Sequence, residues 1–475
     1  MTRQKWPPWP RKGLFFADFH IHSKYSRATS KEMTPAGLAE VAVKKGLSVV
    51  GTGDFTHPGY LRDLKEQLEP APDQPGLYVL RDQPDGPRFV LTAEVSNIYT
   101  QGGRSRRIHT VLFAPDMETA EGIQARLKAI GNISSDGRPI FGFSAKDLVR
   151  LVTEENPECF IVPAHVWTPW FSLFGAKSGF DSIEECFEEQ TEQIHALETG
   201  LSSDPQMNWR LSALDAYTLI SNSDAHSPWK LAREANVFSC KMDYRHMMEA
   251  MAHPKKGFLG TIEFFPEEGK YHFDGHRACG VCLTPKEAMA RDNICPVCGR
   301  PLTMGVAHRV EELADRPEGF VPETALPCVH LIPLEEIIAE AFGVKSITAR
   351  VRREYLRVVE MAGPELEILL WMPEEELKRL LPPDVAQGIV NMRKERIDVT
   401  PGHDGVYGKI RVIGAEGGST SAAPSSNNPG AGGRSKASSA GAGMRQKGLF
   451  AGRGQTGESA SKGERGPRQL NLFDE

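Results

Sequence analysis

The chain has 475 residues, with 56 Lys and Arg against 62 Asp and Glu, and its formal net charge of −6 excludes a uniformly basic nucleic-acid coat but not a local basic groove. Hydrophobic residues make up 40% and charged residues 25%, as in ordinary globular proteins, and the length predicts roughly two to four domains. No run approaches the ~18 apolar residues of a membrane span, and the N-terminus lacks the apolar core of a signal peptide. We therefore expect a cytoplasmic protein that does not enter a membrane.

Residues 1–265 are predicted to form the first domain. Short apolar runs read as buried strands that end in polar residues: LSVVGTGD, RFVLTAEV, RIHTVLFAP, CFIVPAHV and AYTLISNSDAH. Between them lie amphipathic helical patterns, among them residues 34–45 and 119–130. This alternation favours a parallel α/β unit, most simply a barrel, whose chemistry lies at the carboxyl ends of its strands.

Histidines and carboxylates gather at those strand ends. Asp18, His20 and His22 alternate along one strand, so we expect them to share a face, with Asp18 orienting an imidazole. The full predicted ligand set is His20, His22, Asp54, His57, Glu94, His109, His165, Asp224 and His226. Imidazole with carboxylate suits Zn²⁺, Mn²⁺ or Fe²⁺, and a metal pair favours phosphoester hydrolysis, with amide hydrolysis also open on chemistry alone.

The segments DFHIHSKYSRATS, GTGDFTHP, LTAEVSNIY, VPAHVWTPWFSLFG and SNSDAH resemble the motifs of the polymerase-and-histidinol-phosphatase (PHP) superfamily. HSKYSRATSK and AHVWTPWFSLFG are similar to the endonuclease Q family within it, over roughly residues 14–413. The resemblance implies a distorted (β/α)₇ barrel that holds two or three divalent metals, Zn²⁺, Mn²⁺ or Mg²⁺. It also implies catalytic roles for Glu94, His165 and Asp224.

Two positions depart from the superfamily pattern. The usual TDH motif is TGDFTH here, which leaves Phe55 where a His would stand and makes His57 the residue that could replace it. A third ligand after the HxH motif would fall near Ala28, which cannot bind a metal.

Aromatic and basic residues near the predicted site could hold nucleic acid. Trp167, Trp170, Phe171 and Phe174 follow His165, and could stack on a base or staple the loop to the barrel. Arg104, Arg106 and Arg107 could meet backbone phosphates or form an ordinary solvated face.

Residues 266–327 carry two CxxC pairs, Cys279/Cys282 and Cys295/Cys298. This spacing predicts a zinc ribbon with one structural Zn²⁺ bound by four cysteines.

The remaining chain is predicted in three parts. Residues 328–413 read as short helices, either a helix-hairpin-helix-like DNA-binding element or a small domain packed on the barrel. Residues 414–468 are rich in Gly and Ser and read as a disordered linker. Residues 469–475 contain QLNLF, in which Gln469, Leu470, Leu472 and Phe473 resemble the bacterial clamp-binding motif, so we expect the DNA sliding clamp as a partner.

Together these features predict a metal-dependent endodeoxyribonuclease of DNA repair. By resemblance it would cleave the phosphodiester 5′ to uracil, hypoxanthine or an abasic site, and it would be cytoplasmic and nucleoid-associated. The alternatives are a PHP-type small-molecule phosphatase and a non-catalytic DNA-binding adaptor.

Overall fold

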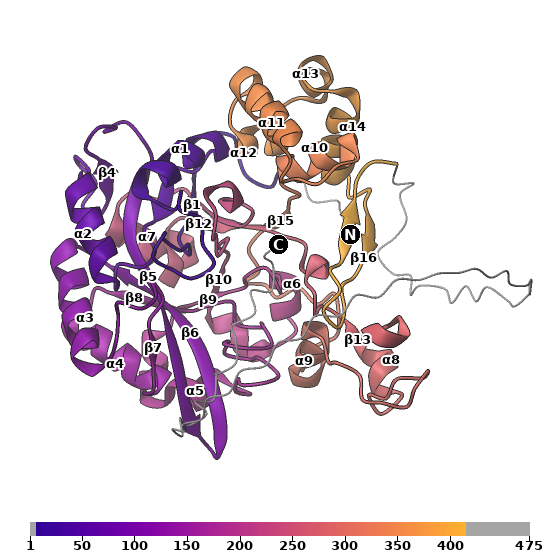
Figure 1. Ribbon diagram of the computed structural model, residues 1–475, viewed down its shortest axis with the longest axis horizontal. Helices are drawn as coiled ribbons and strands as arrows, with labels where there is room; N and C mark the ends of the chain where they lie inside the picture. The colour runs from indigo at the N-terminus through magenta and orange to yellow at the C-terminus, as the bar shows by residue number, and fades with distance from the viewer. Residues whose placement is uncertain (1–5, 415–475) are drawn as a thin grey trace, which may run out of the picture. The chain divides into compact units, whose positions relative to one another are not determined.

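The described part of the chain, residues 6–414 of a computed structural model, is built around a mixed sheet of 11 strands (Figure 1). The main path runs β15-β12-β11-β1-β2-β5-β4-β3, while β6 pairs with β5 and β8, and β7 pairs with β5. The strands are β1 (Phe15–Asp18), β2 (Val49–Gly51), β3 (Leu68–Pro70), β4 (Tyr78–Leu80), β5 (Arg88–Gln101), β6 (Arg104–Ala114), β7 (Ile140–Phe141), β8 (Phe160–Pro163), β11 (Ala235–Phe238), β12 (Phe258–Glu263) and β15 (Cys328–His330).

A smaller parallel sheet, β9 (Ala196–Glu198) and β10 (Thr218–Ile220), continues the arrangement, with β9 beside β8 and β10 beside β12. The strands thus follow one another around a barrel-like ring. Phe15 and Ala17 of β1 pack in one core cluster and Phe16 packs in another, so both faces of this strand are buried. Burial on both faces explains why the strands read as continuous apolar runs in the sequence.

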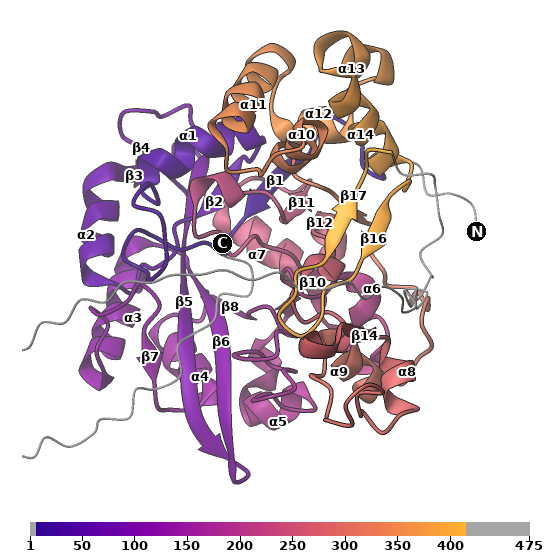
Figure 2. The same ribbon diagram turned by 45° about the vertical axis from the view of Figure 1, so that its right-hand side comes forward.

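The expected strands are present, but the prediction of a parallel sheet is wrong. β1 pairs with β2 in parallel, whereas β1–β11, β11–β12, β5–β6 and β6–β8 are antiparallel. The reason is clearest at β5 and β6, which are joined only by Gly102 and Gly103, both with positive φ. A two-residue turn can connect only antiparallel neighbours, and φ > 0 favours glycine there. Figure 2 shows β5 and β6 lying side by side along this long hairpin as far as its turn.

Helices cover the outside of the ring, and the predicted helices at 34–45 and 119–130 are confirmed as α1 and α3 (Figure 1). The first of them begins where the Thr34 side chain accepts a hydrogen bond from Gly37 N, and ends at Gly46, whose φ is 90°. The helices of this region are α1 (Pro35–Lys45), α2 (Pro58–Gln67), α3 (Met117–Ile130), α4 (Ala145–Glu155), α5 (Ile183–Phe187), α6 (Pro205–Asn208) and α7 (Tyr244–Ala252).

The next segment holds the cysteine pairs in a short antiparallel hairpin and two helices. After it the chain rejoins the main sheet through β15, which pairs with β12. The elements are β13 (Asp274–His276), β14 (Val281–Leu283), α8 (Pro285–Met289) and α9 (Val306–Leu313).

The helical C-terminal region is confirmed. Pro364, Pro373 and Pro382 each precede a helix, and proline at these positions keeps the helices short. A final hairpin, β16–β17, follows. The elements are α10 (Leu334–Phe342), α11 (Ala349–Ala362), α12 (Glu365–Leu370), α13 (Glu374–Leu380), α14 (Pro383–Arg393), β16 (Asp398–Thr400) and β17 (Lys409–Arg411).

A buried ion pair fixes the helical region to the barrel. Lys45 at the end of α1 lies 2.7 Å from the Glu365 carboxylate of α12, and the two side chains are 2% and 4% exposed. Tyr355 of α11 also donates a hydrogen bond to Glu365, at 2.7 Å. All residues from 6 to 414 belong to one compact unit. None of the helices in this part of the chain is long and apolar enough to cross a membrane.

Candidate functional site

Two groups of possible metal ligands lie at the strand ends. The first contains His20, His22 and Asp224, and the second contains Glu94, His109 and His165; within each group the ligand atoms lie within 4.8 Å of one another. These residues come from β5 and β6 or lie within four residues after the ends of β1, β8 and β10, so strands far apart in the chain converge on one site.

Glu94 connects the two groups. Its Oε1 lies 2.5 Å from His109 Nδ1 and 3.2 Å from His165 Nε2. Its Oε2 lies 3.2 Å from His22 Nε2 and 3.5 Å from His20 Nε2. Burial alone would raise the pKa of Glu94, but the neighbouring positive charges hold it well below its usual range. The carboxylate is therefore ionised and placed to bridge two cations.

The donor set fits a pair of divalent metals. Nε2 of His20, His22 and His109, together with Oδ1 of Asp224, are buried without a hydrogen-bond partner among the described residues. Buried polar atoms are normally paired, and imidazole with carboxylate is a ligand set for Zn²⁺, Mn²⁺ or Fe²⁺. Asp224 and His165 also have positive φ values, of 47° and 30°. Left-handed backbone is uncommon outside glycine and gathers at functional sites.

Asp18 does not take the expected role beside His20. The strand β1 ends at Asp18, and the following residues continue only through an isolated bridge at Ile21. The Asp18 carboxylate accepts hydrogen bonds from Ser223 N at 3.1 Å and Ala232 N at 3.0 Å. It therefore anchors the loop that carries Asp224.

Glu198, at the end of β9, orients His20 instead. Its two carboxylate oxygens lie 2.9 and 3.0 Å from His20 Nδ1, and it also accepts from His165 N and Asn222 Nδ2, both at 2.8 Å. Such a carboxylate fixes the tautomer and orientation of a ligating imidazole. The sequence signal was the same as for Glu94, an acidic residue closing an apolar strand.

Asp54 lies behind His22 and outside both groups. Its carboxylate is 3.2 Å from His22 Nδ1 and accepts from Ser23 N at 2.6 Å and Ser26 Oγ at 2.8 Å. Burial would raise the pKa of Asp54, but His22 and these donors lower it. The structure thus gives Asp54 the geometry of an orienting residue.

His57 and His226 also lie outside the two groups. His57 caps α2 by accepting from Gly59 N at 3.2 Å and Tyr60 N at 3.4 Å. The His226 ring is 4.5 Å from that of His22, and its Nδ1 is 2.9 Å from the Asp224 carbonyl oxygen. His57 thus caps a helix, and His226 packs beside the first ligand group.

One cationic residue of the site had no counterpart in the predicted set. Arg138 Nη1 donates to Glu94 Oε2 at 2.7 Å from the segment between α3 and β7.

The aromatic residues after His165 divide into two kinds. Trp167 is fully buried, donates Nε1–H to Asn208 Oδ1 at 2.8 Å and packs 4.8 Å from the Phe174 ring, so these two staple the loop to the barrel. Trp170 is 42% exposed, and the Phe171 ring lies 4.7 Å from that of His109.

The predicted arginines divide in the same way. The Arg107 guanidinium lies 5.4 Å from the Trp170 ring and 5.5 Å from the Phe171 ring, at the edge of the second ligand group. The Arg106 guanidinium lies 4.0 Å from the Phe180 ring and donates to the Gly179 carbonyl, so its contacts hold the hairpin against the segment that carries these two residues. Arg104 is exposed beside the hairpin turn.

The cysteine segment brings together Cys279, Cys295, Cys298 and His276, whose ligand atoms lie within 4.8 Å of one another. Cys282, one of the four predicted ligands, lies in β14 outside this group. Desolvation would raise the pKa of the Cys295 thiol, but the backbone amides of the knuckle lower it to about 6. A thiolate at neutral pH is the form that binds metal.

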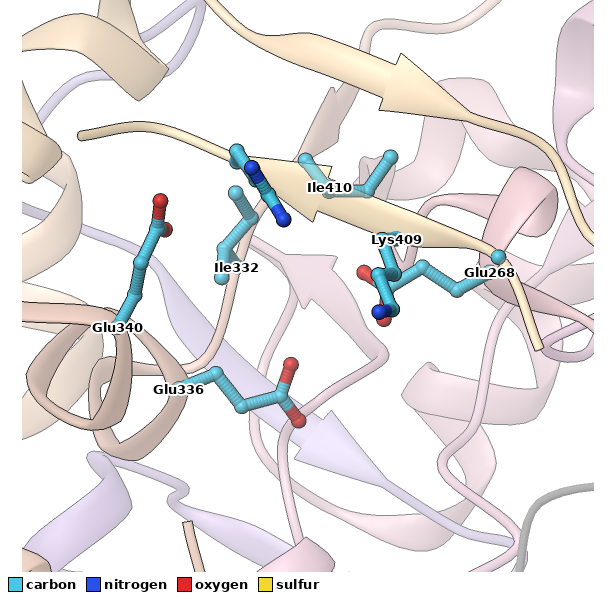
Figure 3. Close-up of a pocket in the computed structure, with 8 residues that line it drawn as sticks. Glu268, Ile332, Glu336, Glu340, Lys409 and Ile410 are labelled. Carbon is cyan, nitrogen blue, oxygen red and sulfur yellow. The ribbon is translucent and has the colours of Figure 1, made fainter. Parts of the chain in front are cut away.

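A separate cavity of about 250 Å³ lies between η5 (Pro266–Glu268), α10 and β17 (Figure 3). Its lining combines Glu268, Glu336 and Glu340 with Lys409 and Arg411. It contains none of the predicted site residues.

Solved structures of known function share this fold. The crystal structure of the lesion-specific endonuclease PfuEndoQ from Pyrococcus furiosus matches with a TM-score of 0.74 and 32% identity, over 84% of this chain and 95% of that one. An endonuclease Q complex with a 27-mer duplex that carries an abasic lesion at the active site matches with a TM-score of 0.74 and 32% identity, over 84% and 97%.

Sequence relatives span both bacteria and archaea. The uncharacterized protein YqxK of Bacillus subtilis is 29% identical over 415 residues, which cover 83% of this chain and 99% of that protein. The uncharacterized protein MJ0043 of Methanocaldococcus jannaschii is 33% identical over 254 residues, 51% of this chain and 31% of that protein. Residues 333–396 match the MJ0043 C-terminal domain family. With its barrel-like ring, its paired ligand groups and its extended match to these crystal structures, the chain belongs to the endonuclease Q family.

Proposed function

We propose that this DNA-repair nuclease hydrolyses the phosphodiester on the 5′ side of a uracil, a hypoxanthine or an abasic site in DNA. The observation that carries the proposal is Glu94, an ionised carboxylate between two groups of ligands, several of whose buried atoms make no hydrogen bond among the described residues. The endonuclease Q complex with an abasic lesion at its active site supports the substrate class.

His20, His22 and Asp224 would hold one divalent metal and Glu94, His109 and His165 a second, with Glu94 shared. Two bound metals lower the pKa of water and stabilise the attacking and leaving oxygens of a phosphoryl displacement. Glu94, His165 and Asp224 are the residues to which we assign catalysis. Glu198 would fix the orientation of the His20 imidazole, and Asp54 that of His22.

In the reaction, a water oxygen bonds to phosphorus and the bond between phosphorus and the 3′ oxygen breaks. The water loses a proton and the 3′ oxygen gains one, which leaves a 3′-hydroxyl and a 5′-phosphate on the lesion nucleotide.

The DNA would enter beside the second ligand group. Trp170 is exposed there, Phe171 packs on His109, and Arg107 lies over both aromatic rings. Aromatic faces can stack on an unpaired base and an arginine can meet a phosphate, so these three side chains form the proposed lesion contact. Arg104, exposed at the turn end of the β5–β6 hairpin, would contact the duplex further along.

The test uses Mn²⁺ or Mg²⁺ with three substrates: a duplex with one uracil, hypoxanthine or abasic site, the same duplex undamaged, and p-nitrophenyl phosphate. The proposal expects a nick only in the lesion strand, on its 5′ side. Preferential hydrolysis of p-nitrophenyl phosphate would favour the small-molecule phosphatase, and lesion binding without cleavage would favour the non-catalytic adaptor.

We also propose that the cysteine segment binds one structural Zn²⁺ through Cys279, Cys295 and Cys298. The fourth ligand is His276 if the group seen here holds the metal, or Cys282 if zinc draws β14 inward. Zinc content of His276→Ala and Cys282→Ser distinguishes the two, because only the variant that lacks a ligand should lose metal.

The clamp partnership, and with it nucleoid association, remains a proposal from the sequence. Nearly all of the predicted linker, from residue 415, and the motif at 469–475 lie outside the described residues. A pull-down with a bacterial sliding clamp tests it. We expect wild-type protein to be retained and the Leu472→Ala/Phe473→Ala double variant to be lost. Equal retention of both would count against the motif.

A further inference from the structure

Arg138 is a buried cation at the centre of the candidate site. Its side chain is 11% exposed, and Nη1 donates to Glu94 Oε2 at 2.7 Å. That oxygen is the one that also faces His20 and His22. A cation is rarely buried without a strong counter-charge, and Glu94 supplies that counter-charge to Arg138.

The charge of Arg138 reaches both ligand groups. An arginine guanidinium keeps its proton in proteins, and the Glu94 oxygen that Arg138 binds lies 3.2 Å from His22 Nε2, which in turn lies 3.1 Å from Asp224 Oδ1. Asp224 belongs to the first ligand group and Glu94 to the second. Arg138 therefore lies close to the place where a phosphate would meet both.

The backbone that carries Arg138 is held on both sides. Gly137 N donates to the Tyr25 carbonyl at 3.1 Å, and the Gly137 carbonyl accepts from Thr56 Oγ1 at 3.2 Å. On the other side, Ser96 N donates to the Pro139 carbonyl at 3.0 Å. A Cβ atom at position 137 would lie 2.2 Å from a carboxylate oxygen of Asp54, so only glycine lets the backbone approach Asp54 this closely.

We propose that Arg138 is a catalytic residue that contacts a non-bridging oxygen of the scissile phosphate while it holds Glu94. This inference rests on the proposed function and names a group within that same site. A guanidinium has five N–H donors in a rigid fork, and Glu94 takes one of them, so one side chain can hold both partners. The fixed cation stabilises the negative charge that gathers on the phosphate oxygens as the phosphorus–oxygen bond breaks.

The sequence around the site is consistent with a fixed cation in place of a third metal. Ala28, where a third ligand was sought, has no donor atom, and His57 is engaged by the helix cap. Arg138 supplies a positive charge to the site without the need for a metal ligand at Ala28 or His57.

The test compares Arg138→Ala and Arg138→Lys with Arg150→Ala, which removes an arginine whose side chain is 54% exposed on α4. We expect Arg138→Ala to lower kcat about 100- to 1,000-fold, as for loss of one transition-state donor, with a much smaller change in KM for DNA. Lysine keeps the charge but not the fork, so kcat should recover only in part. Added guanidinium ion should restore part of the activity of the alanine variant, and Arg150→Ala should match the wild type.

A second readout needs no turnover. Mn²⁺ titrated into the metal-free protein should bind Arg138→Ala as tightly as wild type or more tightly, because a repelling charge has gone from beside Glu94. Weaker metal binding together with no guanidinium rescue would make Arg138 a structural support and overturn the inference. A kcat within about threefold of wild type would overturn it as well.

The outcome can be separated from that of the proposed function by using bis(p-nitrophenyl) phosphate as a second substrate. If wild-type protein cleaves this diester but not lesion DNA, the proposed function fails. The Arg138 inference then stands if the same variants slow diester cleavage, and it fails if they do not.

Discussion

Replacing Glu198 with glutamine tests how the site holds its first metal. Glu198 accepts from His20 Nδ1, His165 N and Asn222 Nδ2. Glutamine keeps the volume but offers one acceptor oxygen and a new NH₂ donor, so one of these donors must face another donor. A hydrogen bond that involves a charged group contributes about 1.5–3 kcal/mol, which corresponds to roughly 10- to 100-fold in affinity. The same range is typical for loss of a carboxylate behind a ligating histidine.

Calorimetric titration of metal-free protein with Mn²⁺ measures this directly, and we expect Glu198→Gln to weaken binding by that factor. The matched control is Asp204→Asn, which removes a buried carboxylate 3.0 Å from His330 Nε2, away from the ligand groups. It should cost stability but leave metal affinity unchanged. If Glu198→Gln bound Mn²⁺ within about threefold of wild type, the orienting role would be refuted.

Four further outcomes are expected. Asp224→Asn should abolish nicking while circular dichroism shows a preserved fold, because it removes the charge of a metal ligand; near-wild-type activity would place the site elsewhere. Trp167→Ala should cost about 3–5 kcal/mol in chemical denaturation, whereas Trp170→Ala should leave stability within about 0.5 kcal/mol and weaken lesion-DNA binding; the reverse pattern would contradict their assigned places. Burial raises the pKa of Glu263 from 4.5 to about 8, so the folded state holds a proton that the unfolded chain releases. The stability that this group contributes is full below pH 4.5 and is lost as pH rises through 8. Glu263→Gln should therefore make the free energy of unfolding less dependent on pH in this range. Cys295→Ser should lose zinc and lower the melting temperature, and full zinc content would refute the cysteine site.

The sequence predicted the strands because most are buried on both faces and read as unbroken apolar runs. Strand direction was mispredicted, although Gly102 and Gly103 between two apolar runs were a readable hairpin signal. The structure places Cys282 outside the group that contains the other three predicted cysteines, a difference that spacing along the chain cannot show.

The six residues of the two ligand groups all belong to the predicted set, since each lies within an apolar strand or a few residues after one. Trp167 and Trp170 look alike in the sequence, and only packing against Asn208, 41 residues further on, separates the core residue from the exposed one. Arg138 had no sequence signal, because it stands in a turn-rich segment, SSDGRPIF, whose position over Glu94 is set by tertiary contacts.

The most direct test of the account is the location of bound metal. Crystals soaked in Mn²⁺ should give two anomalous peaks about 3.5–4 Å apart, as in two-metal phosphoesterases. One peak should lie among His20, His22 and Asp224, the other among His109, His165 and Glu94, and Glu94 should contact both. A protein that nicks lesion DNA but binds its metal elsewhere, or binds a single ion without contact to Glu94, would contradict the account.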